Sequence, residues 1–132
     1  MTPIPVPAHG VDDWLPMVEW HFESFCENGI YQPEDLVADI KDRKRQLWIA
    51  VSKGEVKAVL LTSISDDRLK TCMVTHCAGE NARAWLHLFN VIEEWARAEG
   101  CKRIEATTRP GWEKLLGRFD MAKTHVVLEK RL

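Results

Sequence analysis

Apolar residues recur along the chain at two spacings, and each change of spacing marks a change in the predicted secondary structure. Through residue 42 the apolar positions lie three or four residues apart, as on one face of a helix. From residue 46 to residue 77 they alternate or form short runs bounded by turn residues, which is typical of strands. A helix over residues 81–99 follows, and the chain is predicted to end with a short helix over 111–119 and a strand over 123–132.

Prolines guide the prediction for the N-terminal part. The Pro-rich segment of residues 3–7 is predicted to form an extended lead-in or a short edge strand, where proline is tolerated. Asp12 or Asp13 can cap the first helix, and with Asp13 as the N-cap Pro16 falls in the first turn, where its missing N–H does no harm. A second helix is predicted to begin at Pro33, because a proline followed by acidic residues is a strong helix start signal.

Three runs at strand spacing, residues 46–52, 56–64 and 69–77, are joined by tight turns and predict an antiparallel meander. The helix over 81–99 then leads to a strand over 102–107, which is expected to lie parallel to the strand before the helix, as in a right-handed βαβ unit. The predicted fold class is therefore α/β, with a mixed, mostly antiparallel sheet, a central βαβ crossover and helices on both faces.

Length and composition fit a globular protein. The 132 residues are 45% hydrophobic and 29% charged, so we expect a single domain over residues 1–132 with a sizeable core. No apolar run reaches the roughly 20 residues that span a bilayer, and the start of the chain lacks the basic and apolar regions of a signal peptide. A cytoplasmic location is therefore expected.

The four cysteines do not form a C-x-x-C pair. Cys72 and Cys77 lie on one predicted strand, and their odd spacing is expected to place them on opposite faces, so they cannot share a metal or a disulfide. Together with Cys26 and Cys101 they are interpreted as reduced thiols, and no metal is expected.

Charge is distributed unevenly along the chain. Residues 1–42 hold nine acidic residues and one basic residue, whereas residues 101–132 hold eight basic and four acidic residues. The acidic helices could face a cationic partner and the basic end an anion, or both could be solvated faces. The formal net charge of −2 argues against nucleic acid as the main partner, and no membrane partner is expected.

The element order resembles the GNAT (N-acetyltransferase) superfamily over nearly the whole chain. The closest resemblance lies in the helix-to-strand passage EEWARAEGCKRIEA, which ends its helix at Gly100. The C-terminal segment GWEKLLGRFDMAKTHVVLEKRL also resembles small GNAT-like proteins of phages and prophages. Two further segments carry the resemblance: QLWIAVSKGEVKAVLLTSI and NARAWLHLFN.

This resemblance implies acyl-CoA, specifically acetyl-CoA, as co-substrate. In the family two middle strands splay apart to admit the pantetheine arm, and backbone N–H groups at the start of the long helix hold the pyrophosphate, as a helix N-terminus can. The matching positions here are Cys77, Ala78, Gly79, Asn81, Ala82 and Arg83.

The chain departs from the family pattern at two places. Its pyrophosphate loop has one glycine, Gly79, and carries an acidic residue at Glu80, where phosphates would be repelled. The family's closing helix bears a tyrosine that protonates the departing CoA thiolate, and Leu116 stands at that position.

Three residues are candidates for acid–base chemistry. His76 on the third strand titrates near neutrality and is a candidate base, although it could instead be a packed or solvated strand histidine. Glu105 is a second candidate base, or a paired carboxylate. Tyr31 is the one tyrosine in the chain and lies between the first two helices.

Two functions remain open on this basis. The chain could be an N-acyltransferase in which an amine of a small molecule or protein attacks the acyl-CoA thioester directly in a ternary complex. Alternatively it could be a catalytically silent GNAT-fold protein with a structural or interaction role, phage-encoded or virion-associated, acting as a homo-oligomer or with a phage-particle partner. A phage protein would be found in the host cytoplasm or the virion.

Overall fold

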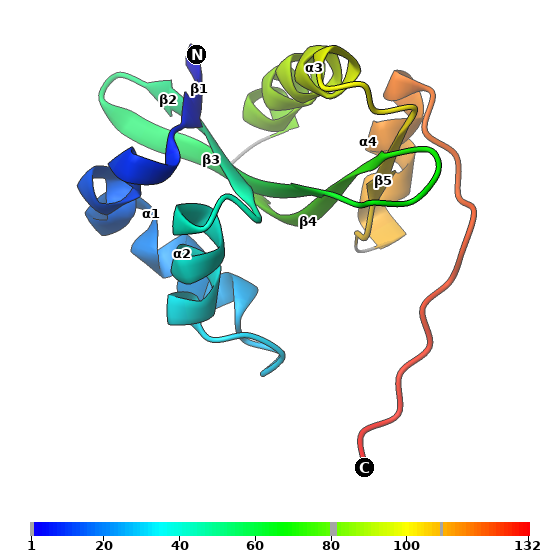
Figure 1. Ribbon diagram of the computed structural model, residues 1–132, viewed down its shortest axis with the longest axis horizontal. Helices are drawn as coiled ribbons and strands as arrows, with labels where there is room; N and C mark the ends of the chain where they lie inside the picture. Colours follow the sequence, from blue (N-terminus) through cyan, green and yellow to red (C-terminus); the bar gives the residue numbers. More distant parts are fainter. Residues whose placement is uncertain (1, 80–81, 109) are drawn as a thin grey trace.

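A five-stranded sheet organises the protein in the computed structural model, which describes residues 2–79, 82–108 and 110–132 (Figure 1). The strands follow one another across the sheet in chain order. β4 and β5 are parallel, and the other three neighbouring pairs are antiparallel. The strands are β1 (Thr2–Val6), β2 (Gln46–Ser52), β3 (Glu55–Ile64), β4 (Thr71–Gly79) and β5 (Arg103–Ala106).

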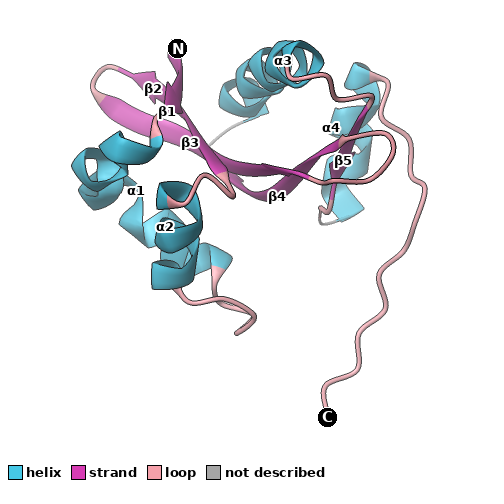
Figure 2. Ribbon diagram, viewed as in Figure 1, coloured by secondary structure: helices cyan, strands magenta, loops and turns pink. Residues whose placement is uncertain are grey.

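Helices cover both faces of the sheet (Figure 2). α1 (Val11–Phe25) and α2 (Pro33–Lys41) pack on one face, and α3 (Ala82–Ala98) packs on the other. The short α4 (Glu113–Leu116) is flanked by single 3₁₀ turns and lies on the α3 face, beside β5. Among the described residues, no helix combines the length and apolarity needed to cross a membrane. The predicted fold class is confirmed, including the parallel β4–α3–β5 unit.

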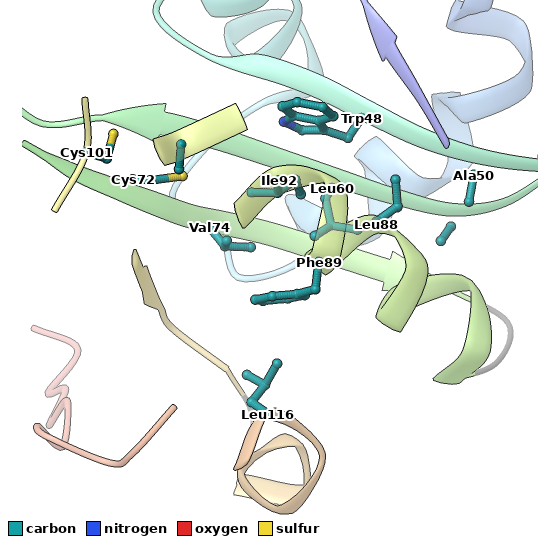
Figure 3. Packing of buried hydrophobic residues seen from close by; sticks show 12 residues of the cluster. Trp48, Ala50, Leu60, Cys72, Val74, Leu88, Phe89, Ile92, Cys101 and Leu116 are labelled. Atoms are coloured by element: carbon teal, nitrogen blue, oxygen red, sulfur yellow. The ribbon is translucent and has the colours of Figure 1, made fainter. Parts of the chain in front are cut away.

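The sheet separates two hydrophobic cores. On the α3 face, Trp48, Leu60 and Val74 of the sheet meet a stripe of α3 side chains, with Leu116 of α4 beyond them (Figure 3). These α3 side chains recur at helical spacing, which is why the helix buries one face. They are Leu88, Phe89 and Ile92. The second core lies between the sheet and the α1–α2 layer, where Phe22 of α1 and Leu36 of α2 are fully buried.

The N-terminal segment forms the edge strand that was one of the two predicted outcomes. β1 pairs with β2, and Pro3 and Pro5 are tolerated because an edge strand has one unpaired side. The predicted cap of α1 was wrong. The helix begins at Val11 directly after a 3₁₀ turn, so Asp13 lies in its first turn and Pro16 lies inside it.

A β-bulge in β4 overturns the prediction for the cysteines. Leu61 of β3 pairs with His76, but the next residue, Thr62, pairs with Val74, so Thr75 is an extra residue on β4. The extra residue cancels the odd spacing between Cys72 and Cys77, and both pack on the α3 face.

The predicted strand over 123–132 was wrong. Residues 121–132 form no helix or strand, and the chain runs away from the sheet after α4 (Figure 1). Val126, Val127 and Leu128 are 65%, 77% and 90% exposed. The segment has strand propensity, but propensity becomes a strand only where a neighbouring strand supplies hydrogen bonds.

We expect the buried pair of Trp48 and Thr62 to be energetically coupled, because the indole N–H donates to the Thr62 hydroxyl at 2.9 Å. Each of Trp48→Phe and Thr62→Val leaves one polar group unpaired and should lower the free energy of unfolding by about 2 kcal/mol. The double variant leaves neither group unpaired, so its cost should be about 1 kcal/mol less than the sum. Urea denaturation of the four proteins measures this, and strict additivity would contradict it.

Candidate active site

β4 extends well beyond its ladder with β5. The parallel pairing begins at Thr71 opposite Arg103 and ends at Val74 opposite Ala106, whereas β4 continues to Gly79. Its other side stays paired to β3 along this length, with Gly79 opposite Ala58. In the described part of the chain, residues 75–79 therefore have no strand partner on the β5 side, and their outward backbone groups are available to a ligand.

Five of the six predicted cofactor-binding residues belong to the end of β4 or to the first turn of α3. Cys77, Ala78 and Gly79 form the end of β4, and Ala82 and Arg83 begin α3. Asn81 lies outside the described residues, as do the side chains of Ala82 and Arg83. Burial raises the pKa of the Cys77 thiol, so this thiol is protonated near neutral pH and is not poised as a nucleophile.

His76 and Tyr31 come together on the opposite face, under α1. The His76 ring centroid lies 5.6 Å from that of Tyr31 in an edge-on arrangement and 5.2 Å from that of Phe25. The bulge explains this placement, because it turns His76 toward the α1–α2 layer while Cys77 faces α3. Two of the three predicted catalytic residues are thus neighbours, although they are far apart in the sequence.

Arg45 completes this cluster and was missed by the sequence reasoning. Its Nη1 donates to Thr75 Oγ1 at 2.7 Å, and its Nε forms an ion pair with Asp39 Oδ2 at 2.9 Å. Its guanidinium lies 5.0 Å from the centre of the Tyr31 ring, within the range of a cation–π contact. In the sequence, Arg45 ends a basic run after α2 and resembles its exposed neighbours. Its side chain is only 10% exposed in the structure, and no sequence signal predicts this burial.

Thr75 links Arg45 to His76. Its hydroxyl accepts from Arg45, donates to the Leu61 carbonyl at 3.3 Å, and lies 3.1 Å from His76 Nδ1. When the hydroxyl donates its one proton to Leu61, it accepts from Nδ1–H, and the lone pair of the ring then lies on Nε2. Burial, and secondarily the charge of Arg45, lower the pKa of His76 from 6.5 to about 4.

Glu105 is not part of this cluster. It lies on β5 opposite Met73, three residues along β4 from His76, which corresponds to about 10 Å along a strand. Its carboxylate forms an ion pair with Arg103 at 3.0 Å, which agrees with the paired-carboxylate alternative. Leu116, at the position of the family's tyrosine, is 5% exposed and packs in the α3-face core.

We predict that His76 makes the protein less stable in mild acid. Between pH 6.5 and about 4 the unfolded chain binds a proton at this histidine that the folded chain does not, so the free energy of unfolding falls as the pH drops. His76→Gln should remove about 1 kcal/mol per pH unit of this dependence, with no change in slope above pH 7. Urea titrations from pH 4.5 to 8 test this, with His125→Gln in the exposed tail as control, and unchanged slopes in His76→Gln would contradict it.

The sequence matches no known family model and no curated protein, but the structure matches solved structures. A probable acetyltransferase aligns with a TM-score of 0.74 at 13% identity, covering 100% of this chain and 97% of that one. Ribosomal-protein-alanine N-acetyltransferase from Brucella melitensis biovar Abortus 2308 aligns with a TM-score of 0.72 at 11% identity, covering 100% of both chains.

A third similar structure contains a ligand. The aminoglycoside N-acetyltransferase AAC(6')-Iy, in complex with the bisubstrate analogue CoA-S-monomethyl-acetylneamine, aligns with a TM-score of 0.75 at 12% identity, covering 99% of this chain and 97% of that one. At such low identity the likeness concerns the fold. The chain has the fold shared by these GNAT acetyltransferases.

Proposed function

We propose that the protein is an acyl-CoA-dependent N-acyltransferase that folds as one domain. The observation that carries the proposal is the free edge of β4 over residues 75–79, which leads directly toward the N-terminus of α3. An exposed strand edge can pair with the amide groups of an extended ligand, and a helix N-terminus favours an anion. Acyl-CoA has both features, since its amide-containing arm ends in a pyrophosphate.

The proposed co-substrate site follows from this edge. The backbone of Cys77, Ala78 and Gly79 would hold the pantetheine arm, and the pyrophosphate would lie at the start of α3, near Asn81, Ala82 and Arg83. AAC(6')-Iy, which shares the fold, has been solved with CoA bound. The bound thioester would supply an activated acyl group.

His76 is the proposed base. A pKa of about 4 keeps the imidazole neutral at physiological pH but makes it a weak base. Its Nε2 would therefore take the proton after the amine has begun its attack, when the amine nitrogen is most acidic, directly or through water. Thr75 would fix the ring orientation through its contact to Nδ1, and Arg45 would hold Thr75 in place. Tyr31, which touches the same ring, is the proposed acid for the departing thiolate, and Glu105 takes no part because Arg103 binds it.

The proposed acceptor is a cationic amine on a small molecule or a protein. Its approach would pass the α1–α2 layer, which belongs to the acidic part of the chain. Negative charge attracts an ammonium group and raises its local concentration. Among structures that share the fold, one enzyme is named for ribosomal-protein alanine and others for aminoglycosides, both of which carry amines.

A silent interaction protein is the second candidate. Leu116 replaces the family's tyrosine with a buried packing residue, and the C-terminal segment presents apolar side chains to solvent. Both features suit a protein whose surface, rather than its co-substrate site, is maintained. A phage origin and a virion or host-cytoplasm location belong to this alternative.

Binding of acetyl-CoA separates the two candidates. We expect micromolar to submillimolar affinity by isothermal titration calorimetry. Thr107→Trp places a large side chain on the first residue after β5, an exposed position where the two strands part, and should weaken binding about tenfold. Asp66→Trp adds the same bulk at the exposed β3–β4 turn, at the other end of β4, and should bind normally. Absence of binding at millimolar acetyl-CoA would rule out the acyltransferase.

The role of His76 as base is tested by measuring the rate at which the free thiol of CoA is released from acetyl-CoA, with spermidine or a lysine-rich peptide as the acceptor. His76→Gln should lower kcat by about a hundredfold and leave acetyl-CoA affinity unchanged. His125→Gln, in the exposed C-terminal segment, is the matched control and should retain full activity. Full activity in His76→Gln would remove His76 from the mechanism without removing the acyltransferase.

A further inference from the structure

The outer face of α1 presents large apolar side chains to solvent. Trp20 is 63% exposed, and Met17, one turn before it on the same side of the helix, is 42% exposed. The inward side of α1 carries Val18 and Phe22, which are fully buried in the core between the sheet and the α1–α2 layer. The ring of Trp20 lies 4.3 Å from that of the buried His21, which restrains the indole. The patch centred on Trp20 therefore lies outside the core and is available to a partner.

Exposed carboxylates border this patch. At helical spacing, Glu23 lies one turn after Trp20 and Asp13 lies two turns before it, on the same side of α1. Glu19 is exposed beside them, and α1 contains no lysine or arginine. Of the four carboxylates of the helix, Asp12 alone forms an ion pair within the described residues, with the last residue of α2 at 3.0 Å. The other three are therefore free to pair with a partner.

This distribution of charge lowers the stability of α1 in the free protein. Glu19 and Glu23 are one turn apart on the helix surface, so their negative charges repel each other. Glu23 also lies in the last turn, where the negative end of the helix dipole disfavours an anion. A cationic partner would offset both effects and would cover the exposed indole of Trp20 at the same time.

We propose that the outer face of α1 docks an arginine-rich segment of a partner protein. A guanidinium would stack on the indole of Trp20 in a cation–π contact, and further basic side chains would pair with the carboxylates of Asp13 and Glu23. From Asp13 to Glu23 the helix spans about 15 Å, which about five extended residues of the partner would match. His76 and Phe25 lie on the inward side of α1, so this docking goes beyond the acyl transfer and does not depend on it.

The charge and shape of this face determine the kind of partner. Negative charge repels phosphate groups, so a nucleic acid or an anionic membrane surface is disfavoured. Arginine suits an exposed indole better than lysine does, because its guanidinium is planar and weakly hydrated. Alternate side chains of an extended polypeptide lie about 7 Å apart, so one arginine can cover Trp20 while the next reaches the carboxylate of Glu23.

The test titrates the full chain into a dye-labelled peptide of alternating arginine and serine, followed by fluorescence anisotropy at physiological ionic strength. Trp20→Leu keeps an apolar side chain but removes the aromatic face, and should raise the dissociation constant about tenfold. Trp20→Phe keeps an aromatic face and should raise it about threefold. Glu23→Gln should also raise it about threefold, whereas Glu94→Gln, at an exposed position of α3 across the sheet, changes the net charge equally and should bind normally.

The substituted positions are exposed, so none of the variants should disturb folding, and the readout requires no acetyl-CoA, so it is independent of the acyltransferase. Absence of peptide binding would overturn the proposal. Equal weakening by Glu23→Gln and Glu94→Gln would show that net charge alone attracts the peptide, and unchanged binding in Trp20→Leu would place the contact elsewhere, so either result would also overturn it. Self-association of the chain that Trp20→Leu abolishes would identify a second copy as the occupant instead.

Discussion

One extra residue in β4, Thr75, determines how the two faces of the sheet are used. Before the bulge, Val74 faces α3, and after it His76 faces α1 and α2 while Cys77 faces α3. The parallel ladder with β5 ends at Val74, immediately before this irregularity. A bulge increases local twist and disturbs pairing, which accounts for the coincidence of the bulge, the end of the ladder and the candidate site.

Arg45 stabilises this irregular region by holding three elements together. It binds Asp39 of α2 and Thr75 of β4, and its guanidinium covers the ring of Tyr31. The ion pair is partly buried, so removal of Asp39 would leave the Arg45 charge without its closest partner and should cost roughly 1–3 kcal/mol. Burial is the main cause of the lowered pKa of His76, and the Arg45 charge adds to it, so the residue that supports the bulge also helps to keep the imidazole neutral.

Local features were predictable from the sequence, and long-range pairing was not. The start of α2 at Pro33 and the bounds of β2 follow from signals within a few residues, including the bond from the Gln32 N–H to Asp35. The bulge at Thr75 depends on how β4 pairs with β3, which no spacing within β4 reveals. The burial of Arg45 was not predicted, and the strand predicted over residues 123–132 was wrong, for the same reason. Burial of a side chain and pairing of a strand are both decided by elements that are distant in the sequence.

The prolines of β1 give the sheet unequal edges. Within a strand, alternate residues direct their N–H groups to the same side, and because Pro3 and Pro5 have no N–H, β1 can donate to β2 only through the residues that alternate with them, Thr2, Ile4 and Val6. The outward positions are then the ones that lack an N–H, so this edge cannot serve as a template for a further strand. With the β1 edge blocked, the β1 edge of one copy cannot pair with the β5 edge of the next, so such edge-to-edge contacts cannot repeat into a fibre.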